Sequence, residues 1–119
     1  MNITKFSELT TLTPHTLRYY EKLGLLTNIS RNSSGHRSYS QADIDWVTFI
    51  NRLRETGMPL EQILEYAHLR AEGESTFEQR RILLQKHRDA LKVRIENELE
   101  HLRMLDLKID YYESHKSLT

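Results

Sequence analysis

The chain has 119 residues and a formal net charge of zero, so no overall excess of positive charge points to a polyanionic partner. It contains no cysteine, which excludes disulfides, thiolate metal sites and thiol-based sensing and favours an intracellular protein. The opening sequence MNITKFSEL has no long apolar run, so we expect no signal peptide, no membrane span and a cytoplasmic protein. Residues 1–60 carry seven Lys and Arg against five Asp and Glu, a balance of +2, so any contact with a polyanion is expected there.

A short first helix is predicted over residues 5–10. Thr4 is a suitable N-cap residue, and Phe6 and Leu9 form an apolar pair on one face. The threonines around Leu12 favour a turn, because their hydroxyls compete for backbone hydrogen bonds.

The segment 13–26, TPHTLRYYEKLGLL, predicts a second helix with a definite start and end. Thr13 is a good N-cap, Pro14 suits the first helical position, and Gly24 can adopt the left-handed conformation that ends a helix. The apolar residues spaced three apart define a buried face, Leu17, Tyr20 and Leu23. The side chains that point elsewhere are His15, Thr16, Arg18, Tyr19 and Lys22.

These outward side chains suit a helix that reads the major groove of DNA. Arginine offers a bidentate fork for phosphate or guanine, and tyrosine offers a rigid plane with a hydroxyl. Two short helices joined by a turn, the second bearing such residues, form a helix-turn-helix pattern. An ordinary surface helix fits the same residues, and the segment alone does not decide between the two interpretations.

A β-hairpin is predicted directly after this helix. The segments 26–31 and 36–39 resemble strands, and the Asn-Ser-Ser-Gly between them is strong turn chemistry. Arg31, His36 and Arg37 then lie near the tip, where a hairpin reaches an adjacent groove or a row of phosphates. The alternative is a hairpin whose arginines contact only water. A basic hairpin directly after a helix-turn-helix favours the interpretation that the hairpin binds DNA.

Two further helices are predicted to close a small core. Ser40 and Asp43 resemble a capping box for a helix that runs to about Glu55, and Pro59 begins the next helix. The apolar residues of these helices, which we interpret as core, are Ile44, Trp46, Val47, Phe49, Ile50 and Leu53, then Leu60, Ile63, Leu64 and Ala67. Arg54, just before the turn between them, either reaches a phosphate or is an exposed helix arginine.

A long final helix is predicted from Thr76 to about His115, a stretch without Gly or Pro. Ser75 and Glu78 match a capping box, and residues 72–74 before it resemble a hinge. At 1.5 Å per residue this helix is roughly 60 Å long, which is too long for a domain of about 70 residues to cover. The apolar residues that recur at steps of three and four are Leu84, Leu91, Ile95, Leu99, Leu102, Leu105, Ile109 and Tyr112.

Charged residues fill the other faces of this helix, so its apolar residues form a seam that needs a partner helix. A solitary extended helix is the alternative, and so exposed a stripe disfavours it. We therefore expect a homodimer, with residues 1–72 as the first domain and residues 73–119 as the dimerisation helix. The pattern does not fix whether the two helices run parallel or antiparallel.

Several stretches together resemble the MerR family of bacterial transcription regulators: HTLRYYEKLGLL, the hairpin NSSGHRSYS, Asp43 and RETGMPLEQI. The resemblance covers residues 1 to about 70, and the long helix fits the family's dimerisation element. It implies a mainly α fold, in which a winged helix-turn-helix domain precedes a long helix that dimerises as an antiparallel coiled coil. It also implies dimers that bind an over-long promoter spacer and distort it, so that RNA polymerase engages both of its recognition elements.

By matching positions, the resemblance implies that DNA is contacted by Arg18, Tyr19, Arg37, Tyr39 and Arg54. Tyr39 equally fits a packing role, as does Tyr20. His15, Thr16 and Lys22, on the outward face of the same helix, complete the predicted DNA-binding set.

The stretches RLRETGM, GESTFEQRRILLQKHR and LDLKIDYYE resemble a small branch of the family that includes aldehyde- and stress-responsive regulators. Members of that branch often place a cysteine just ahead of the TGM turn, where Arg52 stands here. A thiol-adduct trigger is therefore excluded, and the sequence predicts no particular effector. The thiolate metal loop of the metal-responsive members is also missing and the six histidines are scattered, so we expect no metal and no cofactor.

The leading hypothesis is a dimeric, sequence-specific transcription regulator. Its partners are double-stranded promoter DNA, a second copy and, only through the shared promoter, RNA polymerase. The alternative is a dimeric coiled-coil adaptor or structural protein without a specific operator. An enzyme is not expected, because we find no nucleophile elbow, phosphate loop or pair of catalytic carboxylates.

Overall fold

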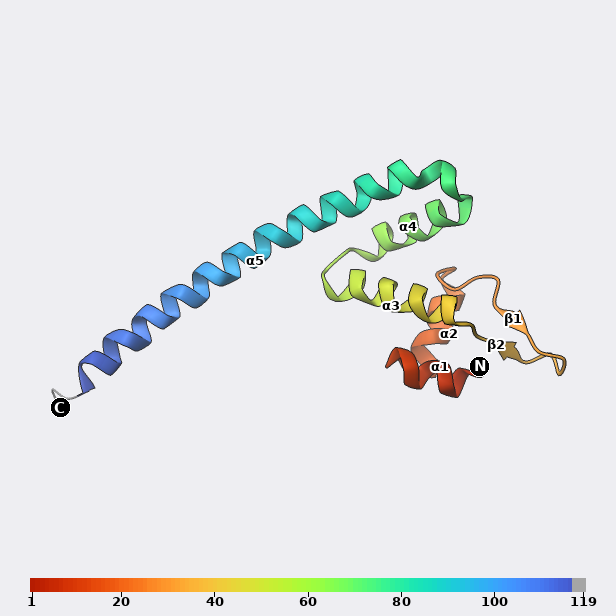
Figure 1. Ribbon diagram of the computed structural model, residues 1–119, viewed down its shortest axis with the longest axis horizontal. Coiled ribbons are helices and arrows are strands. Elements are labelled where there is room, and N and C mark those ends of the chain that lie inside the picture. Colours follow the sequence, from red (N-terminus) through yellow and green to blue (C-terminus); the bar gives the residue numbers. More distant parts are fainter. Residues whose placement is uncertain (117–119) are drawn as a thin grey trace. The chain divides into compact units, whose positions relative to one another are not determined.

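The computed structural model describes residues 1–116 (Figure 1). Contacts within the chain divide it into two compact units, one from Met1 to Arg81 and one that starts at Ile82. The predicted division into residues 1–72 and residues 73–119 concerns the roles of the two parts, and it stays a prediction. The fold is mainly α, as expected from the sequence.

The first two helices pack on each other through a short turn. α1 runs Ile3–Thr10 and α2 runs Pro14–Lys22. Thr13 caps α2 as predicted, because its side-chain oxygen accepts a hydrogen bond from the backbone N–H of Thr16 at 3.1 Å. Gly24 follows the helix with a φ of 85°, the left-handed conformation that the sequence indicated.

α1 begins earlier than predicted. Asn2, not Thr4, is the N-cap residue, because its side-chain oxygen accepts a hydrogen bond from a backbone N–H of the first turn at 2.9 Å. The predicted apolar pair is also wrong, since Phe6 is fully buried whereas Leu9 is 49% exposed. The second buried residue of α1 is Thr10, whose hydroxyl donates to the Phe6 carbonyl at 2.8 Å and so satisfies its polar group.

The hairpin is present but shorter than predicted. β1 is Ser30–Arg31 and β2 is Arg37–Ser38, and the strands pair antiparallel with Arg31 opposite Arg37. Leu26, which was expected to start the first strand, is buried in the core instead. Asn28 has a φ of 58°, a left-handed conformation that interrupts an extended strand.

Two longer helices complete the first unit. α3 spans Gln41–Glu55 and packs against α1, and α4 spans Leu60–Glu72 and packs against α3. The predicted capping box is present, since Ser40 and Asp43 bond each other's backbone N–H through their side chains at 3.2 and 2.9 Å. The apolar core consists of Phe6, Leu17, Tyr20, Leu25, Leu26, Tyr39, Ile44, Val47, Ile50, Leu53, Met58 and Ile63. Leu60 does not join it, because it remains 45% exposed at the start of α4.

α5 is one unbroken helix, Phe77–Ser114, close to its predicted limits (Figure 1). A 3-10 turn, Glu74–Thr76, precedes it, and the carboxylate of Glu78 binds the guanidinium of Arg81 at 2.6 and 2.9 Å. The predicted capping box therefore does not begin this helix. None of the residues of α5, all of which the structure describes, is buried. Across residues 1–116, every helix is too short or too polar to cross a lipid bilayer.

Candidate nucleic-acid interface

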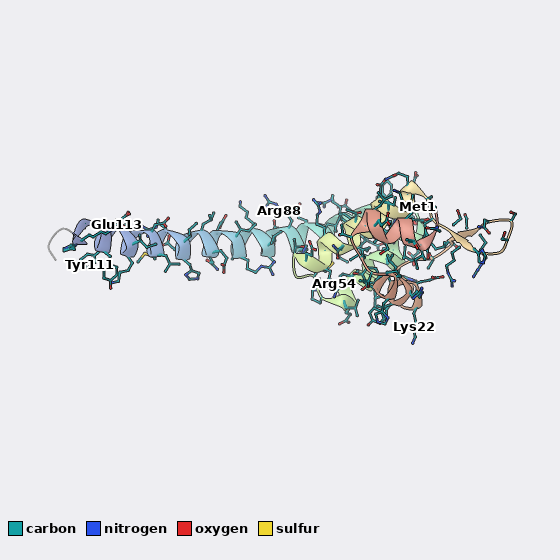
Figure 2. The ribbon with its side chains drawn as sticks, turned by 90° about the horizontal axis from the view of Figure 1, so that it is seen from below. Met1, Lys22, Arg54, Arg88, Tyr111 and Glu113 are labelled. Atoms are coloured by element: carbon teal, nitrogen blue, oxygen red, sulfur yellow. The ribbon has the colours of Figure 1, made fainter. Side chains whose placement is uncertain are left out.

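α2 exposes most of the side chains that the sequence placed on its outer face. The exposed residues are His15, Arg18, Tyr19 and Lys22. Figure 2 shows Lys22 extending away from the helix. Leu17 and Tyr20 of the same helix are buried. Thr16 is only half-exposed, and its hydroxyl accepts a hydrogen bond from the hydroxyl of Thr13 at 3.0 Å. Thr16 therefore contributes to the cap of α2 as well as to its surface.

An ion pair joins the hairpin to α2. Nε of Arg37 in β2 donates to Oε1 of Glu21 in α2 at 2.9 Å. This hydrogen bond, together with the charge of Glu21, raises the pKa of Arg37 above its ordinary value. The Arg37 side chain remains 45% exposed, so Glu21 fixes the position of a guanidinium that solvent and ligands still reach.

Arg18, Arg31 and Arg37 line one open groove of about 620 Å³. The other lining residues come from the start of the chain and from the hairpin: Met1, Asn2, Ile3, Asn32, Gly35, His36, Ser38 and Tyr39. Among the residues that the structure describes, no carboxylate side chain lines this groove. Its arginines favour an anion such as phosphate, and Glu21, just outside the lining, offsets the charge of Arg37. Arg31 was not in the predicted DNA-binding set, and its place at the hairpin tip was the signal that could have included it.

Tyr39 is a core residue whose ring stacks on Phe6, with centroids 4.2 Å apart and planes 7° from parallel. It is only 4% exposed, and this burial raises the pKa of its hydroxyl. Its backbone N–H and carbonyl also pair with the backbone of Met1, each at 2.7 Å. The packing role that the sequence left open is thus present, and the contact with DNA stays a prediction.

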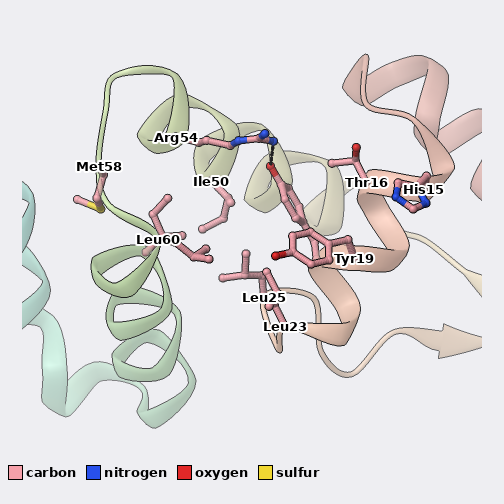
Figure 3. A pocket seen from close by; sticks show the side chains of 11 residues that line it. His15, Thr16, Tyr19, Leu23, Leu25, Ile50, Arg54, Met58 and Leu60 are labelled. Carbon is pink, nitrogen blue, oxygen red and sulfur yellow. Dashed lines mark hydrogen bonds between the residues drawn. The ribbon is translucent and has the colours of Figure 1, made fainter.

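Arg54, near the end of α3, is held by a residue of α2. Its Nη1 donates to the hydroxyl of Tyr20 at 3.1 Å (dashed line in Figure 3), and this hydrogen bond raises the pKa of Arg54. Arg54 lines a hollow of about 400 Å³ together with His15 and Tyr19. The remaining lining residues are Thr16, Tyr20, Leu23, Leu25, Ile50, Met58, Leu60 and Ile63. The structure therefore brings Arg54 beside the outward residues of α2.

The predicted dimerisation residues lie along α5 with much of their apolar surface in water. Ile95, Leu99, Leu102, Leu105, Ile109 and Tyr112 are between 49% and 64% exposed, and Leu84 and Leu91 are half-exposed. Burying such a stripe against another helix is favourable, since each apolar Å² removed from water contributes about 25 cal/mol. Their role in dimerisation stays a prediction. Within residues 1–116, no three His, Asp or Glu side chains gather closely enough to hold a metal ion.

Comparison with known proteins places these features in one family. Residues 1–69 match the MerR HTH family regulatory proteins, and residues 44–109 match a family described as MerR, DNA binding. The HTH-type transcriptional regulator AdhR of Bacillus subtilis is 41% identical over 91 residues, which are 76% of this chain. The matched part of the chain spans 65% of the length of AdhR, less than two thirds of that relative.

Two crystal structures resemble nearly the whole chain. One, from Listeria monocytogenes and assigned to the MerR family of transcriptional regulators, has a TM-score of 0.89 and 42% identity, covering 97% of this chain and 87% of its own. The other is HiNmlR, a MerR family regulator lacking the sensor domain, bound to promoter DNA. It has a TM-score of 0.86 and 30% identity over 99% of this chain and 89% of its own. The chain belongs to the MerR family of HTH transcription regulators.

Proposed function

We propose that the chain is a cytoplasmic transcription regulator that binds promoter DNA as a homodimer and distorts the duplex to control access by RNA polymerase. The observation that carries the proposal is the groove lined by Arg18, Arg31 and Arg37, which has no carboxylate in its lining. Counterion release on neutralising phosphates supplies most of the affinity of such a surface for DNA. The complex of HiNmlR with promoter DNA supports the same use of the shared fold.

In this proposal α2 enters the major groove, and an arginine on each side of it binds the phosphate backbone. Arg37 in the hairpin is positioned by Glu21, and Arg54 in α3 is positioned by Tyr20. Because Tyr20 and Glu21 are neighbours in α2, the helix itself sets the position of both arginines. Arg18 and Tyr19 are then the side chains that face the bases and the nearby backbone.

Dimerisation through α5 gives the proposed regulator two DNA-binding units. One such unit makes few contacts, so a dimer gains affinity by engaging two half-sites of one duplex. RNA polymerase is a partner only through the promoter that both proteins occupy. Distortion of the duplex between the half-sites is the step that would alter how polymerase engages the promoter.

The test is a mobility-shift titration with the DNA upstream of the chain's own gene, over a range of salt concentrations. We expect a specific complex that weakens steeply with salt, and Arg18→Ala should weaken it about 10-fold or more, as for loss of one bidentate base contact. Arg103→Ala, which removes an equal charge from the exposed surface of α5, should leave the affinity unchanged. Equal affinity for unrelated DNA at every salt concentration would overturn the proposal in favour of an adaptor protein.

A further inference from the structure

The hollow beside Arg54 has an apolar floor and a more polar rim. Its volume of about 400 Å³ is within the range of pockets that hold small molecules. The buried lining residues, which form the floor, are Leu25, Ile50, Met58 and Ile63. The exposed lining residues, which form the rim, are His15, Tyr19, Arg54 and Leu60 (Figure 3). All of them belong to the first unit of the chain.

The phosphate backbone that we propose at Arg54 does not account for this floor. A phosphate group is strongly hydrated, so burying it against apolar side chains without hydrogen bonds is unfavourable. Tyr19 and Leu60 remain 48% and 45% exposed, and they continue the apolar surface to the mouth of the hollow. The hollow therefore suits a ligand with an apolar body.

Arg54 supplies a positive charge at the rim. Its Nη1 donates to the hydroxyl of Tyr20 at 3.1 Å, and a guanidinium carries five N–H donors, so Arg54 can bind a carboxylate at the same time. Among the residues that the structure describes, no Asp or Glu lines the hollow. Glu55, next to Arg54 in the chain, lies outside the lining and accepts a hydrogen bond from Asn51 at 3.1 Å. Its charge offsets part of the charge of Arg54, but its carboxylate does not fill the hollow.

We propose that the hollow binds a small organic acid in its ionised form, with the carboxylate at Arg54 and the apolar body against the floor. Arg54 and Tyr19 also belong to the predicted DNA-binding set, so the acid and DNA compete for the same side chains. Binding of the acid therefore releases the chain from its promoter. The competition rests on the proposed function, whereas the binding of the acid does not.

The three methionines of the chain report on three separate places. Met58 lines the hollow, Met1 lines the groove that contains Arg18, and Met104 is exposed on α5. The full chain is therefore labelled isotopically in its methionine methyl groups and titrated in the NMR spectrometer. The probe is cinnamate, whose aromatic ring shifts the signal of a methyl group beside it. Cinnamamide has the same body without the charge, and acetate has the charge without the body.

We expect cinnamate to shift the Met58 signal in a saturable manner and to leave the Met1 and Met104 signals in place. Cinnamamide should bind about 10-fold more weakly, because it cannot form charge-assisted hydrogen bonds with Arg54, and acetate should not shift Met58. Arg54→Gln should remove the preference for cinnamate over cinnamamide. Arg18→Gln, which removes an equal charge outside the hollow, is the matched control and should preserve that preference.

The apolar part of the site is tested at Leu60. Leu60→Ser removes apolar surface from the rim and should weaken the binding of cinnamate and cinnamamide alike, each by about 3-fold. Leu9→Ser is the matched control, because Leu9 is 49% exposed in α1 and does not line the hollow. It should leave both affinities unchanged.

Competition is measured by mobility shift with the DNA upstream of the chain's own gene. At ten times its dissociation constant, cinnamate should weaken DNA binding about 10-fold, and an equal concentration of acetate controls for ionic strength.

A Met58 signal that stays in place at millimolar cinnamate would overturn the site. Equal affinity for cinnamate and cinnamamide in the unmodified chain would overturn the role of Arg54. Saturation of the Met58 signal without loss of DNA affinity would overturn the competition. If no specific DNA complex forms before any acid is added, the proposed function fails instead, and the Met58 titration still decides whether the hollow binds the acid.

Discussion

Arg37 of the hairpin and Glu21 of α2 form an ion pair of 2.9 Å between residues 16 positions apart in the sequence. The carboxylate holds the guanidinium in a fixed place beside the proposed reading helix. It also brings a negative charge close to a surface that we propose binds phosphates. Positioning and electrostatic attraction therefore act in opposite directions at Glu21, and a substitution can separate them.

Glu21→Gln is expected to tighten DNA binding. The amide oxygen still accepts the hydrogen bond from Arg37, while one negative charge leaves the interface. Affinity at low salt should rise about 3-fold. The plot of log affinity against log salt concentration should also become steeper, by less than the slope that corresponds to one released counterion. Mobility-shift titrations at several salt concentrations measure both quantities. Glu113→Gln, in α5, is the charge-matched control, and weaker binding by Glu21→Gln would show that the full charge is needed to place Arg37.

Tyr39→Phe separates the packing role of Tyr39 from its proposed contact with DNA. The phenyl ring keeps the stack on Phe6, so the free energy of unfolding should change by less than about 0.5 kcal/mol. Loss of a hydroxyl that binds phosphate should lower DNA affinity about 5-fold, which corresponds to the net free energy of one hydrogen bond. Thermal unfolding and mobility shift on the same preparation test both expectations. Unchanged affinity would leave Tyr39 as a core residue only.

Trp46 in α3 connects three segments of the first unit. Its indole Nε1 donates to the carbonyl of Leu25 at 2.6 Å, and the guanidinium of Arg70 in α4 lies 4.0 Å from its ring centroid. Trp46→Phe should destabilise the fold by about 1–2 kcal/mol, because the Leu25 carbonyl loses its donor. Arg70→Ala should cost about 0.5–1 kcal/mol through loss of the cation–π contact. Urea unfolding followed by circular dichroism measures both changes in stability. An unchanged midpoint for Trp46→Phe would mean that a water molecule donates to the Leu25 carbonyl in place of the indole.

The features that the sequence predicted well depend on residues close together in the chain. The cap of α2 at Thr13, the capping box of Ser40 and Asp43, and the end of α2 at Gly24 each involve residues no more than a few positions apart. The length of α5 followed from the absence of Gly and Pro. Local chemistry of this kind can be read without knowing the tertiary structure.

The features that it missed depend on which segments meet. Periodicity identified an apolar residue at Leu9 but could not show that its side chain stays 49% exposed. Leu26 was assigned to a strand, because no local pattern shows that this side chain is buried in the core. The bonds from Glu21 to Arg37 and from Tyr20 to Arg54 join residues 16 and 34 positions apart, so no local pattern predicts them. The sequence therefore predicted the arginines of the candidate site but not the residues that position them.

Replacing Leu102 and Leu105 together by lysine is expected to give monomers. Both side chains are more than half-exposed on the proposed seam, so the substitutions place four charges in a dimer interface while leaving the isolated helix intact. Met104→Lys with Leu107→Lys is the matched control, because these residues are equally apolar and about half-exposed but lie off the seam. Sedimentation should give a monomeric mass for the first variant and a dimeric mass for the control. DNA affinity should fall with the dimer, since each half-site contact is weak alone. A dimeric mass for the Leu102 and Leu105 variant would refute the seam.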